Sequence, residues 1–211
     1  MKKTFAALLF AGAALAANAG PLESLENFIK TAKTGHADFT QVVTAPPKNG
    51  QAGKTRTSTG TFDFERPNRF RFVYRKPFEQ TIVADGQTLW MHDVDLNQVT
   101  SRKQAKVLAS TPAALIAAAP DLETLKKDFD LSALPESGGL QWVQALPRTK
   151  EGQLASMKVG FKGEQLAALD ITDSFGQRSV LTFNGMQVNA GVPADAFRFT
   201  PPQGADVVKA P

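Results

Sequence analysis

Large aromatic side chains alternate with polar ones along residues 59–74. All five aromatics in this stretch fall at even positions: Phe62, Phe64, Phe70, Phe72 and Tyr74. Because side chains alternate between the two faces of a strand, two strands joined by a turn at residues 66–69 would present all five on one face. The odd positions are mostly charged. The pattern therefore predicts a hairpin with one aromatic face and one charged face, and the aromatic face could be core or a binding surface.

Helical spacing of apolar residues appears in two other stretches. Residues 21–33 carry apolar side chains, Phe28 among them, at intervals of three and four, which predicts an amphipathic helix. Residues 121–128 predict a shorter helix, and Asp121 stands where it can cap that helix.

Between these two helices, residues 111–120 form an apolar segment that differs from its surroundings. It is bracketed by Pro112 and Pro120 and includes Leu115 and Ile116. A helix that is apolar all round must be buried or must cover something apolar. We expect a short helix here, and the pattern leaves open whether it is a core helix or a lid.

Alternation with a period of two dominates the rest of the chain, and turn residues rich in Gly, Asp and Ser separate the segments. The further strands expected from it are residues 38–43, 81–84, 88–92, 97–102, 129–134, 140–146, 156–161, 166–172, 179–184 and 197–199. A spacing of about ten residues per strand is typical of an antiparallel barrel or sandwich. No internal repeat or linker divides the chain, so we expect one domain over residues 20–211.

The first 19 residues have the three parts of a secretory signal peptide. Lys2 and Lys3 form a basic start, an apolar run follows, and Ala17-Asn18-Ala19 offers a cleavage site before Gly20. Residues 14–16 offer a second site three residues earlier. The apolar run is shorter than the about 20 residues that a membrane-spanning helix needs. We therefore expect export to the periplasm and cleavage.

Composition excludes several classes of site. The chain has no cysteine, which excludes disulfides, thiolate chemistry and the attachment residue of a lipid anchor, so we expect a soluble, monomeric mature protein. Removing Lys2 and Lys3 lowers the formal net charge from +4 to +2, which does not favour nucleic acid as a partner. A local basic band could be a solvated face or a docking surface, and its residues are Arg66, Arg69, Arg71, Arg75 and Lys76.

Candidate chemistry is sparse. His36 and His92 belong to different elements and lack a second ligand at a suitable spacing, so we expect no metal and no cofactor. The sequence contains no nucleophile elbow, no phosphate-binding loop and no dinucleotide fingerprint. We therefore expect a binding protein with an apolar cavity inside a curled sheet rather than an enzyme.

Several stretches, taken in this order and behind a signal peptide, resemble the periplasmic outer-membrane lipoprotein carriers of Gram-negative bacteria, the LolA family. They are residues 37–41, 60–62, 66–70, 85–90, 111–116 and 197–204. The resemblance implies an unclosed antiparallel β-barrel of about eleven strands, with an N-terminal helix and short helices that form a lid over a hydrophobic cavity. It also implies that the protein takes lipoproteins from an inner-membrane ABC transporter and delivers them to an outer-membrane receptor.

The resemblance also implies roles for particular residues. Arg66 matches the arginine that tethers the lid, here through backbone carbonyls near residues 114–116, and without the family a turn arginine in water would be the simpler interpretation. Phe70 and Phe72 match cavity positions. The predicted cavity lining is Phe28, Phe62, Phe64, Phe70, Phe72, Tyr74, Trp90, Leu115 and Ile116. The candidate docking residues are Arg69, Arg71, Arg75 and Lys76.

Three alternatives stay open at this point. A carrier of another exported lipid or glycolipid could use the same fold. A lipid hydrolase would need a nucleophile with a base in reach, for which His36 and His92 are poorly placed. A sensor domain that binds a peptide at a sheet edge would carry no lipid.

Overall fold

The computed structural model describes residues 20–107, 119–149, 153–193 and 195–210. Its helices in these ranges are α1 (Pro21–Thr31), α2 (Gln104–Val107) and α4 (Leu122–Asp128). Its strands are β1 (Thr34–Thr44), β2 (Thr55–Glu65), β3 (Arg69–Lys76), β4 (Gln80–Asp85), β5 (Thr88–Asp93), β6 (Gln98–Lys103), β7 (Phe129–Ser137), β8 (Leu140–Pro147), β9 (Leu154–Lys162), β10 (Gln165–Asp173), β11 (Arg178–Val188) and β12 (Asp206–Lys209). The predicted signal peptide and most of the apolar segment 111–120 lie outside the described residues.

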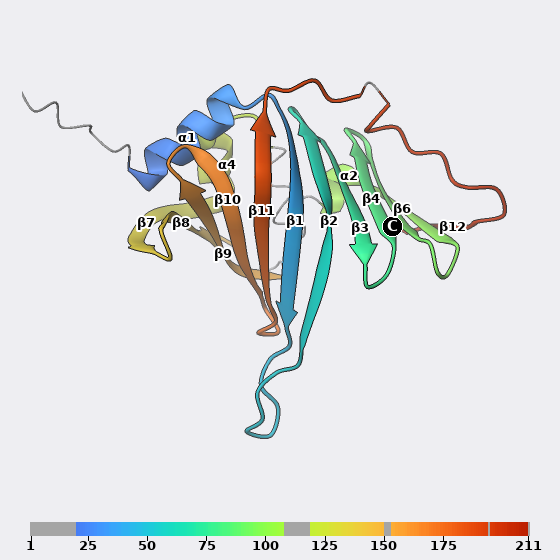
Figure 1. Cartoon of the computed structure of the whole chain (residues 1–211), viewed down its shortest axis with the longest axis horizontal. Coiled ribbons are helices and arrows are strands. Elements are labelled where there is room, and N and C mark those ends of the chain that lie inside the picture. Colours follow the sequence, from blue (N-terminus) through green and yellow to red (C-terminus); the bar gives the residue numbers. More distant parts are fainter. Residues whose placement is uncertain (1–19, 108–118, 150–152, 194, 211) are drawn as a thin grey trace, which may run out of the picture.

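All twelve strands belong to one sheet, in the order β12-β6-β5-β4-β3-β2-β1-β11-β10-β9-β8-β7. Neighbours are antiparallel except β12, which runs parallel to β6. In the described part of the chain the two outermost strands, β7 and β12, do not pair with each other, so the sheet curls without closing (Figure 1). The predicted unclosed antiparallel barrel is confirmed, with twelve strands in place of about eleven.

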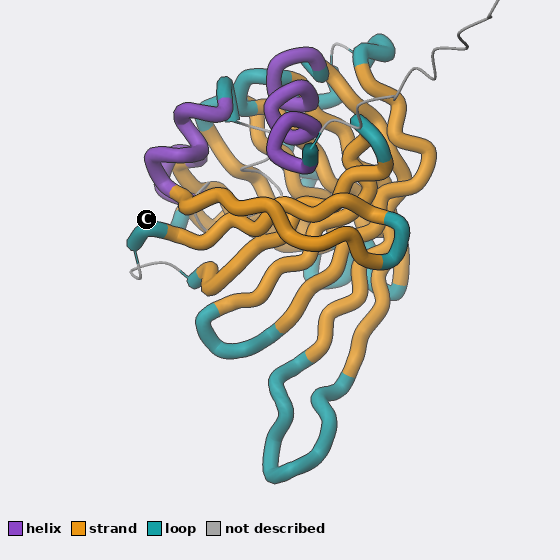
Figure 2. Tube along the Cα trace, turned by 90° about the vertical axis from the view of Figure 1, so that its left-hand side faces the viewer, coloured by secondary structure: helices purple, strands orange, loops and turns teal. Residues whose placement is uncertain are grey.

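Helices cover one part of the concave face. The predicted helices at residues 21–33 and 121–128 are confirmed as α1 and α4, and the Asp121 carboxylate caps α4 by accepting a hydrogen bond of 2.7 Å from the Thr124 backbone N–H. Helix α1 packs against strands β7 to β10 and against α4 (Figure 2). Its buried side chains Leu25, Phe28 and Ile29 thus close the core at this end.

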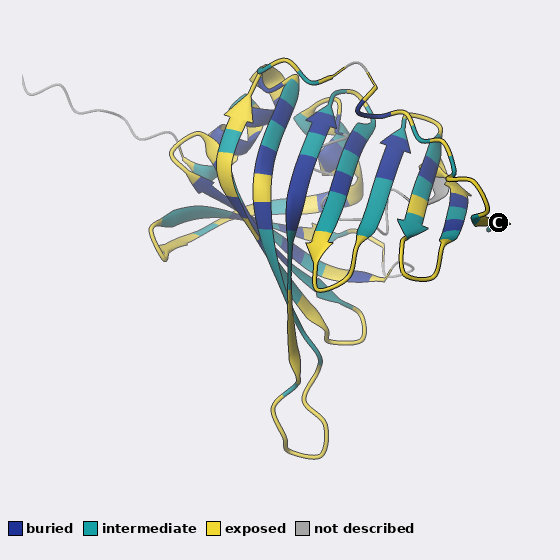
Figure 3. Ribbon diagram, turned by 45° about the vertical axis from the view of Figure 1, so that its right-hand side comes forward, coloured by how far each residue is buried: buried dark blue, intermediate teal, exposed yellow. Residues whose placement is uncertain are grey.

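The predicted aromatic hairpin forms as β2 and β3. Phe62 pairs with Phe72 and Phe64 pairs with Phe70 across the ladder, so these four side chains share the concave face. Buried positions alternate with partly exposed ones along most of β3, and similar bands cross neighbouring strands (Figure 3). Gly35 on β1 makes room for this face, because a Cβ at that position would lie 2.1 Å from a ring atom of Phe64.

The prediction of a strand at residues 197–199 is wrong. These residues belong to a turn and an irregular segment that crosses the outer face of the sheet before β12 (Figure 1). Phe197 is buried there, while Phe199 stacks on Trp90 at a centroid distance of 5.5 Å. The alternation of Phe197 and Phe199 thus reflects the packing of a connecting segment onto the sheet. The last strand in the described part of the chain is β12.

Candidate functional site

A cluster of aromatic rings fills the concave face beneath α1. The rings of Phe62 and Phe72 stack at 4.5 Å between centroids, and the Phe28 ring of α1 lies 5.9 Å from that of Phe64. We call the following set the aromatic cluster: Phe28, Phe39, Phe62, Phe64, Phe70, Phe72 and Tyr74. All of them except Tyr74 are buried. Six predicted lining residues therefore lie together and contact one another.

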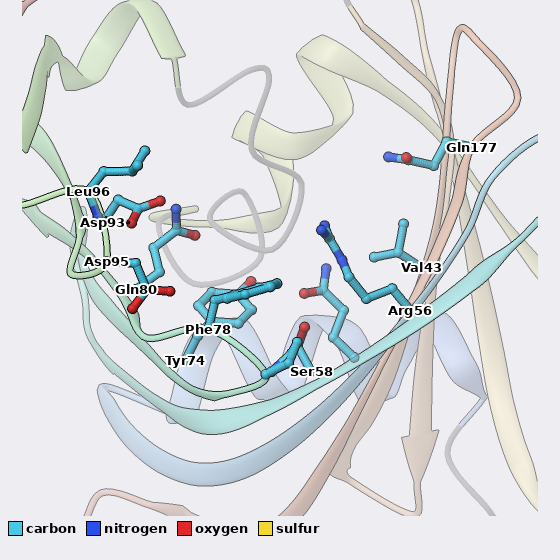
Figure 4. Close-up of a pocket in the computed structure, with 12 residues that line it drawn as sticks. Val43, Arg56, Ser58, Tyr74, Phe78, Gln80, Asp93, Asp95, Leu96 and Gln177 are labelled. Atoms are coloured by element: carbon cyan, nitrogen blue, oxygen red, sulfur yellow. Dashed lines mark hydrogen bonds between the residues drawn. The ribbon is translucent and has the colours of Figure 1, made fainter. Parts of the chain in front are cut away.

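An open cavity of about 630 Å³ continues the concave face beyond Tyr74 (Figure 4). Its lining residues are Gln41, Val43, Arg56, Ser58, Tyr74, Pro77, Phe78, Gln80, Asp93, Asp95, Leu96 and Gln177. Register places the cavity on the same face as the aromatic cluster, because Gln80 pairs with Tyr74 and Gln41 with Ser58. Tyr74 belongs to both regions, since its ring also packs on Phe39 at 5.0 Å.

Arg66 connects three elements at the closed end of the concave face. Its Nε donates a hydrogen bond of 2.8 Å to the carbonyl of Ala32, directly after α1, and its Nη1 donates one of 2.7 Å to the carbonyl of Ala119, shortly before α4. The guanidinium also lies 5.4 Å from the ring centroids of Phe28 and Phe64. Arg66 thus joins the turn after β2 to both helices that cover the aromatic cluster.

Burial shifts the pKa of two groups in this region. Desolvation lowers the pKa of Arg66 from its ordinary value to about 10, so the guanidinium stays charged at neutral pH. Desolvation raises the pKa of Tyr74 from 10.0 to about 12, because the phenolate would lose its water. Both groups are thus largely removed from water, Arg66 beside the helices and Tyr74 at the border between the cluster and the open cavity.

Trp90 lies apart from the aromatic cluster. Register pairs it with Val83, which in turn pairs with Arg71, and these residues are on the outer face. Its ring stacks on Phe199, and its Nε1 donates a hydrogen bond of 3.1 Å to the Asp85 carboxylate. Even-numbered residues face the concave side on β4, but odd-numbered residues do so on β5, because Ala84 pairs with Leu89. The even-numbered Trp90 therefore points outward.

The two remaining predicted lining residues, Leu115 and Ile116, lie outside the described residues, as do the carbonyls at residues 114–116 that were expected to accept from Arg66. Among the described residues, the carbonyls of Ala32 and Ala119 accept hydrogen bonds from Arg66. The role of Arg66 as the lid tether stays a prediction.

The four candidate docking residues differ in exposure. Arg69 forms an ion pair with Glu65 and lies over the ring of Phe197 at 5.8 Å. The Nε of Arg71 is buried without a hydrogen-bond partner among the described residues. Of the four, only Arg75 and Lys76, at the end of β3, are exposed.

Sequence reasoning missed the polar half of the concave face. Gln41 follows Phe39 by two positions in β1, and Gln80 precedes Ile82 by two in β4, so strand alternation places both glutamines on the concave face. The Gln41 side chain donates a hydrogen bond of 2.7 Å to the Ser179 hydroxyl. The alternation that located the aromatic rings could also have located these two glutamines, if it had been applied to polar residues.

The described residues contain no group of three or more side chains that could hold a metal ion. The His36 Nδ1 lies 2.6 Å from an Asp63 carboxylate oxygen on the outer face, whereas the His92 ring lies near that of Phe199. The two histidines therefore contact different residues. Among the described helices, none has both the length and the apolar character to cross a membrane. The site offers binding surfaces of two kinds, apolar and polar.

Comparisons with known proteins agree with this geometry. Residues 30–200 match the family described as outer membrane lipoprotein carrier protein LolA. A relative from Albidiferax ferrireducens, named outer-membrane lipoprotein carrier protein, is 63% identical over 211 residues, which cover 98% of this chain and 99% of the relative. A relative of the same name from Methylibium petroleiphilum is 56% identical over 196 residues, which cover 93% of each chain.

Among solved structures, the crystal structure of an uncharacterized conserved protein from Thermus thermophilus is similar, with a TM-score of 0.50 and 13% identity. The match covers 90% of this chain and 97% of that one. At this identity the likeness shows a shared fold alone.

Proposed function

This chain belongs to the LolA family of outer-membrane lipoprotein carrier proteins, and we propose that it carries lipoproteins across the periplasm. It accepts them from an inner-membrane ABC transporter complex, shields their acyl chains on the concave face and delivers them to an outer-membrane receptor. The family consists of carriers, which confirms the expectation that the chain is not an enzyme.

The aromatic cluster is the observation that carries this proposal. Phe62, Phe64, Phe70 and Phe72 come from one hairpin, and α1 covers them with Phe28. A hydrophobic surface covered by helices, rather than by another sheet, can exchange its cover for acyl chains if the helices move. Acyl chains would then take the place of the contacts that α1 now makes.

Binding energies explain why such cargo needs a carrier. Burying one methylene group is worth about 0.8 kcal/mol, so an acyl chain of about fifteen methylenes gains roughly 12 kcal/mol over water. Several such chains would formally exceed the practical limit of about 18 to 21 kcal/mol for noncovalent binding. Cargo therefore has to pass directly from one apolar site to the next, and the carrier must hold it no more tightly than the receptor does.

Arg66 provides a way to limit that affinity. Its hydrogen bonds to the carbonyls of Ala32 and Ala119 hold α1 and the segment before α4 over the aromatic cluster. A hydrogen bond with one charged partner contributes about 1.5–3 kcal/mol. Opening for cargo breaks these bonds, and release restores them, so the closed state competes with bound acyl chains.

Arg75 and Lys76 are our proposed docking residues for acidic partner surfaces, because both are exposed at the end of β3. Electrostatic attraction of this kind accelerates association more than it strengthens binding. Charge reversal at both positions should slow association with the transporter or the receptor in low salt. Unchanged association rates would exclude this surface.

The test is release of lipoproteins from spheroplasts by the purified mature protein, with the complex identified by native mass spectrometry. We expect a complex of one carrier with one triacylated lipoprotein. A bound mass that fits only a phospholipid or glycolipid would favour a different cargo, and recovery of the empty protein alone would contradict the proposal.

Phe72→Glu provides a negative control in the same assay. Phe72 is 3% exposed, and a carboxylate there would be desolvated in apolar surroundings or become protonated. We expect the variant to recover little or no lipoprotein, and normal recovery would remove this side chain from the site.

A further inference from the structure

The open cavity differs chemically from the aromatic cluster that it adjoins. Three side-chain amides from separate parts of the sheet line it, those of Gln41, Gln80 and Gln177, together with the Ser58 hydroxyl. The Gln41 Nε2 donates to the Ser179 hydroxyl, and an acyl chain, which has no hydrogen-bonding groups, would bury the remaining amide donors and acceptors without a partner. The cavity is therefore suited to a ligand that both donates and accepts hydrogen bonds.

The position of the cavity limits what that ligand can be. The Tyr74 ring contacts Phe39 and Phe72 in the cluster and also lines the cavity, so the two sites share one wall. In a lipoprotein, the acyl chains join the polypeptide through one lipidated cysteine at its N-terminus. The polypeptide therefore starts within a few bonds of any acyl chain held by the cluster.

We infer that the open cavity binds the first residues of the cargo polypeptide in an extended conformation. The inference rests on the proposed carrier function. Each backbone unit offers one N–H donor and one C=O acceptor, and a glutamine amide offers both complements. A volume of about 630 Å³ suits a short segment rather than a folded domain, since small-ligand pockets span about 300–1,000 Å³.

Charges and exposed apolar groups around the cavity are consistent with a peptide. Arg56 extends from one side, and Asp93 and Asp95 stand on the other, so both signs of charge are available to a chain that crosses between them (Figure 4). Phe78 and Leu96 are 60% and 71% exposed at the same site. A peptide would cover these two large apolar side chains, which water now surrounds.

The experiment is a competition between two synthetic lipids for the purified mature protein. One is triacylated S-glyceryl-cysteine amide, and the other carries six further neutral residues of serine, asparagine and alanine. Native mass spectrometry of an equimolar mixture gives the ratio of the two complexes. We expect the lipopeptide to be preferred about tenfold, which is the effect of one or two net hydrogen bonds.

Substitutions in the cavity test whether its glutamines cause the preference for the lipopeptide. Gln41→Leu/Gln80→Leu should reduce it to about twofold or less while binding of the lipid without the peptide persists, because one to two net hydrogen bonds are removed. Gln187→Leu is the matched control, since Gln187 is an exposed glutamine on β11 that pairs with His36 on the outer face, and it should keep the full preference.

Equal binding of the two lipids by the unmodified protein would overturn the inference and leave the carrier function intact. If neither lipid binds, the proposed function itself fails. Loss of both lipids by the double variant, with retained fold by circular dichroism, would show that the cavity holds acyl chains and would also overturn the inference. The comparison on the unmodified protein decides the matter even if the double variant does not fold.

Discussion

The two halves of the concave face are built from the same strands and have opposite character. On β3, Phe70 and Phe72 are buried in the aromatic cluster, and two positions later Tyr74 already borders the open cavity. On β4, Ile82 packs against the cluster and Gln80 lines the cavity. Among the described residues, the half under the helices thus supplies most of the core, while the half beyond Tyr74 contributes little to it.

The largest difference between the halves should appear in folding stability. Phe70 is fully buried, and truncation to alanine at such a site lowers the free energy of unfolding by about 3–5 kcal/mol. Phe78 is 60% exposed in the cavity, and its truncation should change that free energy by no more than about 0.5 kcal/mol. Urea denaturation followed by tryptophan fluorescence measures both. Similar losses for Phe70→Ala and Phe78→Ala would remove the distinction between the two halves.

Tyr74 reports on the border between the halves, and it is the only tyrosine in the chain. Burial raises its pKa to about 12, so the absorbance of tyrosinate near 295 nm should appear around that pH in the folded protein. In concentrated urea the midpoint should return to the ordinary value of about 10. A midpoint near 10 in the folded protein would show that water reaches the ring from the cavity.

The same shift predicts how stability depends on pH. Between pH 10 and about 12 the folded protein keeps the phenol proton that the unfolded chain loses, so rising pH favours unfolding over this interval. The contribution of Tyr74 is fully present below pH 10 and lost progressively above it. Tyr74→Phe has no proton to lose, and its stability should fall less over this interval than that of the unmodified protein.

Arg66→Leu should change cargo release more than folding. Leucine cannot form the hydrogen bonds to Ala32 and Ala119 by which we propose that Arg66 restores the closed arrangement, so loaded carrier should accumulate, with release slowed about 10- to 100-fold. The measurement is transfer of a labelled lipoprotein to outer-membrane vesicles that contain the receptor. Arg198→Leu is the control, because Arg198 is exposed outside both halves. Equal release by Arg66→Leu and the unmodified protein would contradict the tether.

The sequence allowed the closed half to be predicted better than the open half. Strand alternation alone located Phe62, Phe64, Phe70 and Phe72 on one face, because a buried face imposes a period of two. Gln41 and Gln80 follow the same alternation, but a polar residue on a concave face has no compositional signal that separates it from an exposed one. Only the register of four neighbouring strands, β1 to β4, brings their side chains together.

Contacts between distant segments explain the remaining differences from prediction. Trp90 was expected among the rings, but the turn after β4 reverses the alternation, and Phe199 covers it on the outer face. Likewise, Phe197 and Phe199 resemble a strand in sequence because they alternate, although they contact the sheet from a connecting segment. The Ala32 carbonyl was not expected to accept from Arg66, since no local pattern relates the two residues.

The smallest expected effect tests whether the open half is neutral for folding. Gln80→Leu adds an apolar side chain to a cavity wall that is not packed, so the free energy of unfolding should change by about 0.5 kcal/mol or less. Ile82→Gln, two residues along β4 on the same face, places an amide against the aromatic cluster and should cost about 1–3 kcal/mol. If Gln80→Leu destabilises the protein as much as Ile82→Gln does, the cavity glutamines serve the fold, and their amides are not held in reserve for a ligand.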